Sequence, residues 1–204
     1  GVEHRCISIE PAYEMMLNLL NPSFEGREPD ITEENLQARI RGDIVMALSN
    51  KFGWLPLATS NKSEAAVGYC TIYGDMCGGF APLMDVSKMR VYELSRYRNG
   101  ISPAIPENVI SRPPSAELRP DQQDQDSLPP YEILDQVLQR YVEQDQSIEQ
   151  IVDDGFDKAM VHRVARLVLI NEYKRRQAAP GVRITHRAFG RDRRYPITSQ
   201  WRNQ

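Results

Sequence analysis

The sequence predicts an α/β fold in which helices cover a parallel β-sheet, and it predicts only part of that sheet. Two short apolar runs have the pattern of strands, residues 4–9 (HRCISI) and 54–59 (WLPLAT). Helical patterns follow both runs, which is the strand–helix alternation of a layered α/β domain. Since two strands are too few for a complete sheet, we expect the chain to be part of a larger domain.

The first part of the chain is expected to hold two helices. The first covers residues 11–20, with a proline in its first turn, where the missing N–H costs nothing. After a turn-rich loop at 21–31, the second runs from Thr32, its predicted N-cap, to about residue 50. Its buried stripe recurs every four residues and consists of Leu36, Ile40, Ile44 and Leu48.

Loops rich in glycine or proline separate the middle elements. Residues 60–80 hold six small or flexible residues that are typical of turns, including Gly68, Gly74, Gly78 and Gly79. A helix follows at 87–99, with a serine at its N-cap and a glycine just past its end. Residues 101–130 are rich in proline and acidic side chains, so we expect them to be irregular and mobile.

The C-terminal region is predicted to be helical, with helices at about 130–143, 147–153 and 157–177. A basic, proline-containing tail is expected over residues 181–204. The last of these helices presents one apolar face, which holds Met160, Val164, Leu167, Val168 and Asn171.

The composition is that of a globular protein, with 41% hydrophobic and 26% charged residues. No run approaches the ~20 apolar residues that a membrane-spanning helix needs. The net charge of −3 conceals a segregation, because residues 107–157 carry 13 acidic and 3 basic side chains, whereas residues 158–204 carry 2 acidic and 12 basic ones. Such blocks either pair with each other and with water or meet two different partners.

Cysteine usage and the start of the chain give two further expectations. Cys6, Cys70 and Cys77 are odd in number and lack zinc-site spacing, which favours a reducing, cytoplasmic setting. The chain begins with Gly1 rather than Met and shows no charged and apolar leader. We therefore expect a fragment without a secretory signal.

Candidate ligand-binding residues follow the second predicted strand, where open α/β sheets place their sites. The loop at 56–64 (PLATSNKSE) offers the Thr59 hydroxyl at the strand end and the Glu64 carboxylate about one turn later. An oxygen ligand of this kind suits Mg²⁺. The alternative is that Thr59 is a strand-end hydroxyl and Glu64 a partner of a helix dipole.

Further candidates lie on the predicted helices. Asn35 and Arg39 are four residues apart and share a face, where they could bind a hydroxyl and a phosphate, or simply face solvent. Lys88 is in a first turn, where the helix dipole disfavours a cation, so an anionic partner is expected. Lys174 lies near a helix C-terminus, where dipole complementarity alone would explain it.

Several stretches together resemble the synthetase domain of glutamine-dependent NAD synthetases. The resemblance covers most of residues 1–180. It is carried by residues 34–42 (ENLQARIRG), 57–83 (LATSNKSEAAVGYCTIYGDMCGGFAPL), 84–98 (MDVSKMRVYELSRYR), 124–135 (DQDSLPPYEILD) and 171–180 (NEYKRRQAAP).

The resemblance implies a parallel-sheet, adenine-nucleotide α-hydrolase-like (Rossmann-like) domain. It also implies ATP-dependent amidation of nicotinic acid adenine dinucleotide (deamido-NAD) to NAD, with ATP and Mg²⁺ as cofactors. AMP is transferred to the pyridine carboxylate, pyrophosphate leaves, and ammonia from an upstream glutaminase domain displaces AMP. A homodimer or higher homo-oligomer in the cytoplasm is implied, with no membrane or nucleic-acid partner.

The resemblance also assigns site residues position by position. Thr59, Lys88 and Ser115 match ATP contacts. Asn35, Arg39, Glu64 and Lys174 match contacts of deamido-NAD, with Glu64 also at the Mg²⁺ end and Lys174 expected to reach across a dimer interface.

Two positions depart from the shorter ammonia-dependent relatives, since Ile72 replaces a substrate-contacting lysine and Gly79 an aspartate. The family's Ser-Gly-Gly-x-Asp-Ser pyrophosphate loop and its glutaminase cysteine are absent from the sequence, so no catalytic residue is assigned and we expect little or no synthetase activity from this chain alone. The alternatives are another ATP-pyrophosphatase amidotransferase, a non-catalytic dimerisation fragment, or a nucleic-acid-binding fragment with its basic C-terminal block.

Overall fold

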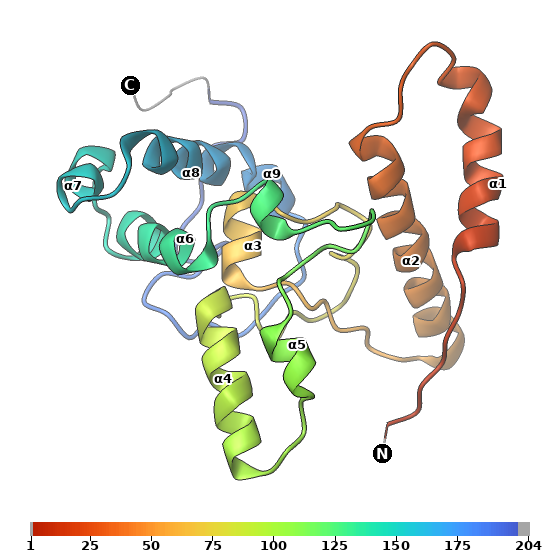
Figure 1. Ribbon diagram of the computed structural model, residues 1–204, viewed down its shortest axis with the longest axis horizontal. Helices are drawn as coiled ribbons and strands as arrows, with labels where there is room; N and C mark the ends of the chain where they lie inside the picture. The colour runs from red at the N-terminus through yellow and green to blue at the C-terminus, as the bar shows by residue number, and fades with distance from the viewer. Residues whose placement is uncertain (1, 200–204) are drawn as a thin grey trace.

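The computed structural model describes residues 2–199 and is built mainly from helices (Figure 1). None of the helices within these residues is long and apolar enough to cross a membrane. The α-helices are α1 (Glu10–Leu20), α2 (Ile31–Phe52), α3 (Lys62–Val67), α4 (Lys88–Ile101), α5 (Glu107–Ser111), α6 (Tyr131–Leu138), α7 (Ile148–Asp153), α8 (Lys158–Ile170) and α9 (Glu172–Arg175). Short helical turns cover Asn21–Ser23, Asp124–Asp126 and Gln139–Glu143.

The helices form three groups (Figure 1). The antiparallel pair α1 and α2 stands on one side, α4 and α5 form a second projecting pair, and α6, α7 and α8 gather around α3 and α9. The core lies in this last group, where Leu134, Ile151 and Val161 are fully buried. Since α3 packs against both α6 and α8, this core fixes the position of α3 and of the loops on either side of it.

The predicted sheet is not formed by the described residues. Residues 4–8 are exposed, Ile9 is half-buried, and none of them has a strand pairing, whereas residues 54–59 contain a single parallel bridge from Leu57 to Phe80. Ala58 N–H donates to the Phe80 carbonyl at 2.9 Å, and Gly79 N–H donates to the Pro56 carbonyl at 3.0 Å. A strand needs a ladder of such bonds to a neighbour, and the neighbour found here offers only this short pairing, so the parallel-sheet expectation is not confirmed.

Two helix boundaries differ from the sequence prediction. Asp30, not Thr32, caps α2, because its carboxylate accepts the Thr32 N–H at 2.7 Å while Glu33 reaches back to the Asp30 N–H at 2.7 Å. The helix predicted at 157–177 is interrupted at Asn171, whose side chain donates to the carbonyls of Val67 and Leu167, both at 2.9 Å. Asn171 therefore separates α8 from α9, and its side chain ties this point to the end of α3.

The remaining differences between the predicted and the observed elements involve shorter segments. The glycine-rich segment 60–80 contains the helix α3, which we had not predicted, and α4 continues through Gly100 to end at Ile101. Residues 101–130 are mostly irregular, as predicted, apart from α5 and the turn at Asp124–Asp126. Both predicted helices between 130 and 153 are confirmed as α6, with the turn that follows it, and α7.

The described part of the predicted C-terminal tail packs onto the core; residues 200–204 lie outside the described residues. Ala188 and Tyr195 are buried, and Tyr195 joins the core cluster. Arg187 and Arg193 both pair with Asp145, so part of the basic block neutralises part of the acidic block.

Candidate functional site

A large cavity of about 650 Å³ lies between α2, α3 and the loop that follows α5. Its volume is within the range of roughly 300–1,000 Å³ that small-molecule and cofactor sites occupy. Six of the seven residues proposed from the sequence line it: Asn35, Thr59, Glu64, Lys88, Ser115 and Lys174. The fold therefore places residues that are up to 139 positions apart in the sequence around the same cavity.

Glu64 and Lys88 form an ion pair within this cavity. Lys88 Nζ lies 3.0 Å from Glu64 Oε1, and each side chain is 18% exposed. Burial lowers the pKa of Lys88, but the charge and hydrogen bond of Glu64 outweigh it, so this pKa lies above its usual range. The structure thus gives Lys88 the anionic partner that was expected, and that partner is Glu64.

Glu64 has a second role in its own helix. Its Oε2 accepts the Asn61 N–H at 3.2 Å, and Asn61 Oδ1 accepts the Glu64 N–H at 3.0 Å. This reciprocal pair is a capping box that starts α3. Both oxygens of the Glu64 carboxylate are therefore held in place, which fixes its position at the cavity wall.

The N-terminus of α4 is fixed by Ser63 and Asp135. Asp135 accepts the Met89 N–H at 2.8 Å and also accepts the Ser63 hydroxyl, whose oxygen receives the Lys88 N–H at 2.9 Å. Burial raises the pKa of Asp135. Because these bonds orient the first turn of α4, they also orient Lys88 toward the cavity.

Lys174 and Asn35 both line the cavity and bind neighbouring parts of the segment that follows α3. Lys174 Nζ donates to the carbonyls of Gly68 and Cys70, both at 2.7 Å, so it lies at the end of α3 in its own chain. Asn35 Oδ1 accepts the Thr71 hydroxyl at 2.8 Å. Both side chains are half-buried and hydrogen-bonded.

The remaining candidates differ in placement. Thr59 is exposed on the cavity wall, and Ser115 Oγ accepts the Glu117 N–H at 3.1 Å. Arg39 is exposed outside the cavity lining, with its Nε 3.3 Å from the Ile72 carbonyl oxygen. The structure therefore does not bring Arg39 together with the other six.

Asp124 and Tyr69 are among the cavity-lining residues that have no role in the sequence-based proposal. Asp124 is 3% exposed and lines the cavity, and its Oδ2 accepts the Tyr131 hydroxyl at 2.8 Å. Tyr69 also lines the cavity, and burial together with the Asp124 charge raises the pKa of its hydroxyl. The stretch containing Asp124 was recognisable in the sequence, but a carboxylate between loops gives no spacing signal of its own.

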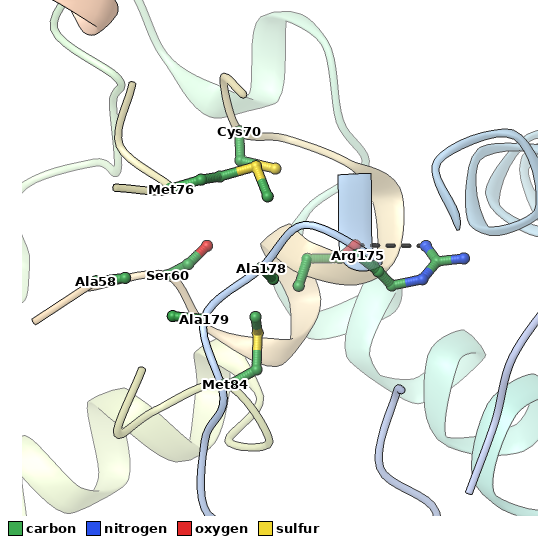
Figure 2. Close-up of a pocket in the computed structure, with 9 residues that line it drawn as sticks. Ala58, Ser60, Cys70, Met76, Met84, Arg175, Ala178 and Ala179 are labelled. Atoms are coloured by element: carbon green, nitrogen blue, oxygen red, sulfur yellow. Dashed lines mark hydrogen bonds between the residues drawn. The ribbon is translucent and has the colours of Figure 1, made fainter. Parts of the chain in front are cut away.

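A much smaller void adjoins this region (Figure 2). Its walls include Cys70, Met76, Met84 and Arg175, with Cys70 shared with the large cavity. Its volume of about 10 Å³ is close to the minimum that one water molecule needs. Of these two spaces, only the large cavity has room for a small-molecule ligand.

The environment of Cys70 predicts low thiol reactivity. Burial raises its pKa to about 12, so roughly one molecule in ten thousand carries the reactive thiolate at pH 8. We expect iodoacetamide to modify Cys70 at least about 100-fold more slowly than the exposed Cys6. Peptide mass spectrometry at timed intervals measures both rates in one sample, and equal rates would contradict this environment.

Comparisons with known proteins agree on one family. A family model described as NAD synthase matches residues 1–178. The glutamine-dependent NAD(+) synthetase of Xanthomonas campestris pv. campestris (strain 8004) is 60% identical over 100% of this chain, which covers 37% of that relative. The enzyme of the same name from Acinetobacter baylyi is 60% identical over 99% of the chain, which covers 38% of it. The chain thus spans little more than a third of the curated relatives it matches.

Solved structures give the same result. A glutamine-dependent NAD+ synthetase from Acinetobacter baumannii, in complex with ADP, is 53% identical with a TM-score of 0.51 over 93% of this chain and 34% of that one. A glutamine-dependent NAD(+) synthetase from Cytophaga hutchinsonii is 28% identical, with a TM-score of 0.69 over 94% of this chain and 32% of that one. The helical arrangement is therefore that of a known synthetase fold.

Proposed function

Since this chain belongs to the NAD synthase family, we propose that its large cavity binds ATP and deamido-NAD for the ATP-dependent amidation that yields NAD. The observation that carries the proposal is the gathering of six of the seven proposed contact residues around one cavity. The alternative of an ordinary solvated surface would not bring together side chains from α2, α3, α4, α9 and the loop after α5.

The chemistry requires activation of a poor electrophile. The carboxylate oxygen of deamido-NAD attacks the α-phosphate of ATP, the bond to pyrophosphate breaks, and ammonia then displaces AMP at the carbonyl carbon. In the proposed site Lys88 and Lys174 supply positive charge for phosphates, while Thr59, Ser115 and Asn35 offer polar groups that orient the nucleotides. Positioning and charge stabilisation of this kind account for most of the acceleration in such transfers.

Mg²⁺ would neutralise charge on the polyphosphate when bound. No group of three or more His, Cys, Asp or Glu side chains able to hold a metal occurs among the described residues. Mg²⁺ in nucleotide sites is commonly held by one or two carboxylates plus substrate phosphates, so Glu64 alone is compatible with it. For Glu64 to bind Mg²⁺, its ion pair with Lys88 must break. Lys88 would then pair with a phosphate of the nucleotide.

The rest of the reaction lies with the longer protein that the relatives represent. We propose that ammonia comes from glutamine in another part of such a protein and that the working form is a homo-oligomer. The expectation that this chain alone makes little NAD from ATP, deamido-NAD and ammonia is tested by a direct assay. A rate near that of a full-length relative would overturn it.

Ligand stabilisation tests the proposed function. At 100 times its dissociation constant, deamido-NAD is expected to add ~2.7 kcal/mol to the free energy of unfolding, measured by thermal denaturation. Xanthosine monophosphate, a ligand of the alternative amidotransferase class, is expected to add nothing. ATP is expected to stabilise the wild type but to stabilise Lys88→Met less, because the Lys88 charge in the cavity is lost.

The Lys51→Met variant is the matched control, since Lys51 is exposed on α2 and outside the cavity lining. It should keep the full response to both ligands. Stabilisation by xanthosine monophosphate but not by deamido-NAD would reverse the assignment.

A further inference from the structure

Asp124 has one carboxylate oxygen that accepts no hydrogen bond from the part of the chain that the structure describes. The residue is 3% exposed and lines the large cavity. Its Oδ2 accepts the Tyr131 hydroxyl, whereas its Oδ1 is buried with no hydrogen-bond partner among the described residues. A buried acceptor that has lost its hydration without gaining a hydrogen bond is unfavourable, most of all when it is charged, so this oxygen needs an explanation.

The backbone holds this carboxylate in place. Asp124 N–H donates to the Pro114 carbonyl at 2.9 Å, and the Asp124 carbonyl accepts the N–H groups of Ser127 at 3.1 Å and Leu128 at 2.9 Å. These bonds connect the loop that carries Ser115 to the start of the core. A fixed position is what a binding group needs if little ordering is to be lost when the ligand arrives.

The surroundings specify the kind of ligand group. Tyr131 contacts both Asp124 and Lys88, since its hydroxyl donates to Asp124 Oδ2 at 2.8 Å and Lys88 Nζ lies 5.1 Å from the centroid of its ring. Asp124 is therefore near Lys88, in the part of the cavity proposed for ATP. A carboxylate repels phosphate oxygens and accepts hydrogen bonds from hydroxyl and amino groups. The complementary part of ATP is therefore its adenosine, with donors on the ribose and on the adenine.

We propose that Asp124 is an ATP-binding residue whose free Oδ1 accepts a hydrogen bond from a ribose hydroxyl or the exocyclic amine of the adenosine. This inference rests on the proposed function, because it takes ATP as a ligand of the cavity. It adds an acceptor for the nucleoside to the groups already proposed for the phosphates. A carboxylate serves the same purpose on the ribose of dinucleotides in other folds.

Calorimetric titration of the chain with ATP, 2′-deoxy-ATP, 3′-deoxy-ATP and inosine triphosphate tests the proposal. Asp124→Ala is expected to bind ATP roughly ten- to hundredfold more weakly than the wild type, the usual cost of a hydrogen bond to a charged group. The analogue that lacks the donor should bind the two proteins equally, which identifies the donor as a ribose hydroxyl or the amine. Deamido-NAD binding should change less than about threefold.

Two further variants separate binding from a structural role. Tyr131→Phe removes the partner of Oδ2 and leaves Oδ1 untouched, so its ATP affinity should stay within about threefold of the wild type. Asp124→Asn keeps a carbonyl acceptor and should restore part of the loss. Thermal denaturation of each variant confirms that it is folded.

The outcomes distinguish this inference from the proposed function. Equal ATP affinity of Asp124→Ala and the wild type would overturn the inference, and so would a loss that persists with every analogue, extends equally to deamido-NAD, or is matched by Tyr131→Phe. A wild-type chain that binds neither ATP nor deamido-NAD would instead overturn the proposed function, and the inference with it.

Discussion

Replacing Lys62 by methionine is expected to cost about 3–5 kcal/mol of the free energy of unfolding, the usual result of removing one partner from a buried ion pair. Lys62 is 4% exposed, and its Nζ lies 2.9 Å from Asp85 Oδ1 and 2.7 Å from Glu143 Oε1. It also donates to the Thr185 hydroxyl at 2.6 Å. Its loss would leave two carboxylates facing each other with little access to water.

The expected effect is large because this cluster joins four parts of the chain, around Lys62, Asp85, Glu143 and Thr185. Asp85 accepts the N–H groups of Ile184 and Thr185 at 2.8 and 2.7 Å, and Glu143 ends the turn that follows α6. Burial raises the pKa of Asp85, but hydrogen bonds from Thr185 and Lys62 outweigh it, so the pKa lies below its usual value. At pH values above the ordinary aspartate pKa, the Asp85 carboxylate therefore contributes its full stabilisation of the folded protein. This stabilisation is lost as the pH falls through the lowered pKa of Asp85 in the folded protein.

Urea denaturation at pH 7 measures the effect, and Lys51→Met serves as the control. Lys51 lies exposed in the last turn of α2, so its replacement should cost no more than about 1 kcal/mol, the value of a dipole interaction. A loss below about 1 kcal/mol for Lys62→Met would show that Asp85 and Glu143 find other partners.

The expected contribution of Lys62 to stability could not be predicted from the sequence. Its neighbours along the chain, Thr59 and Glu64, were found because they belong to a recognisable motif. The partners of Lys62 lie 23 to 125 positions away, and no periodicity reports such a contact. The helix α3 was missed for a related reason, since six residues between glycine-rich loops are too short for a helical pattern and owe their shape to packing against α6 and α8.

The longer helices were predictable, because the stripe of α2 and the apolar faces of α6 and α8 repeat often enough to be recognised. The strands were not confirmed, because strand formation depends on a neighbouring strand rather than on the run itself. The cavity residues were identified through resemblance, and the structure added their mutual placement. Asp124 shows the limit of that approach, because a recognised stretch does not say which of its side chains lacks a partner.

Gly68→Ala is expected to destabilise the protein by about 3 kcal/mol, from left-handed backbone strain and overpacking together. Gly68 ends α3 with φ of 71°, and an added Cβ would lie 2.1 Å from Asn171 Cγ. Asn171 would have to move away from the Val67 carbonyl that it binds at 2.9 Å. The Gly68 carbonyl also accepts a hydrogen bond from Lys174 Nζ. Because Lys174 is a proposed contact of deamido-NAD, the change should also weaken the proposed binding of deamido-NAD.

Gly53→Ala isolates the steric part of this effect. Gly53 ends α2 with φ of 68° and has nothing within 4 Å of an added Cβ, so only the backbone strain of about 1 kcal/mol remains. Urea denaturation of both variants should therefore show a difference of about 2 kcal/mol, and only Gly68→Ala should alter ligand binding. Equal losses of unfolding free energy in the two variants would mean that Asn171 can move away from residue 68 without cost. The end of α3 would then not depend on its contact with Asn171, where α8 ends and α9 begins.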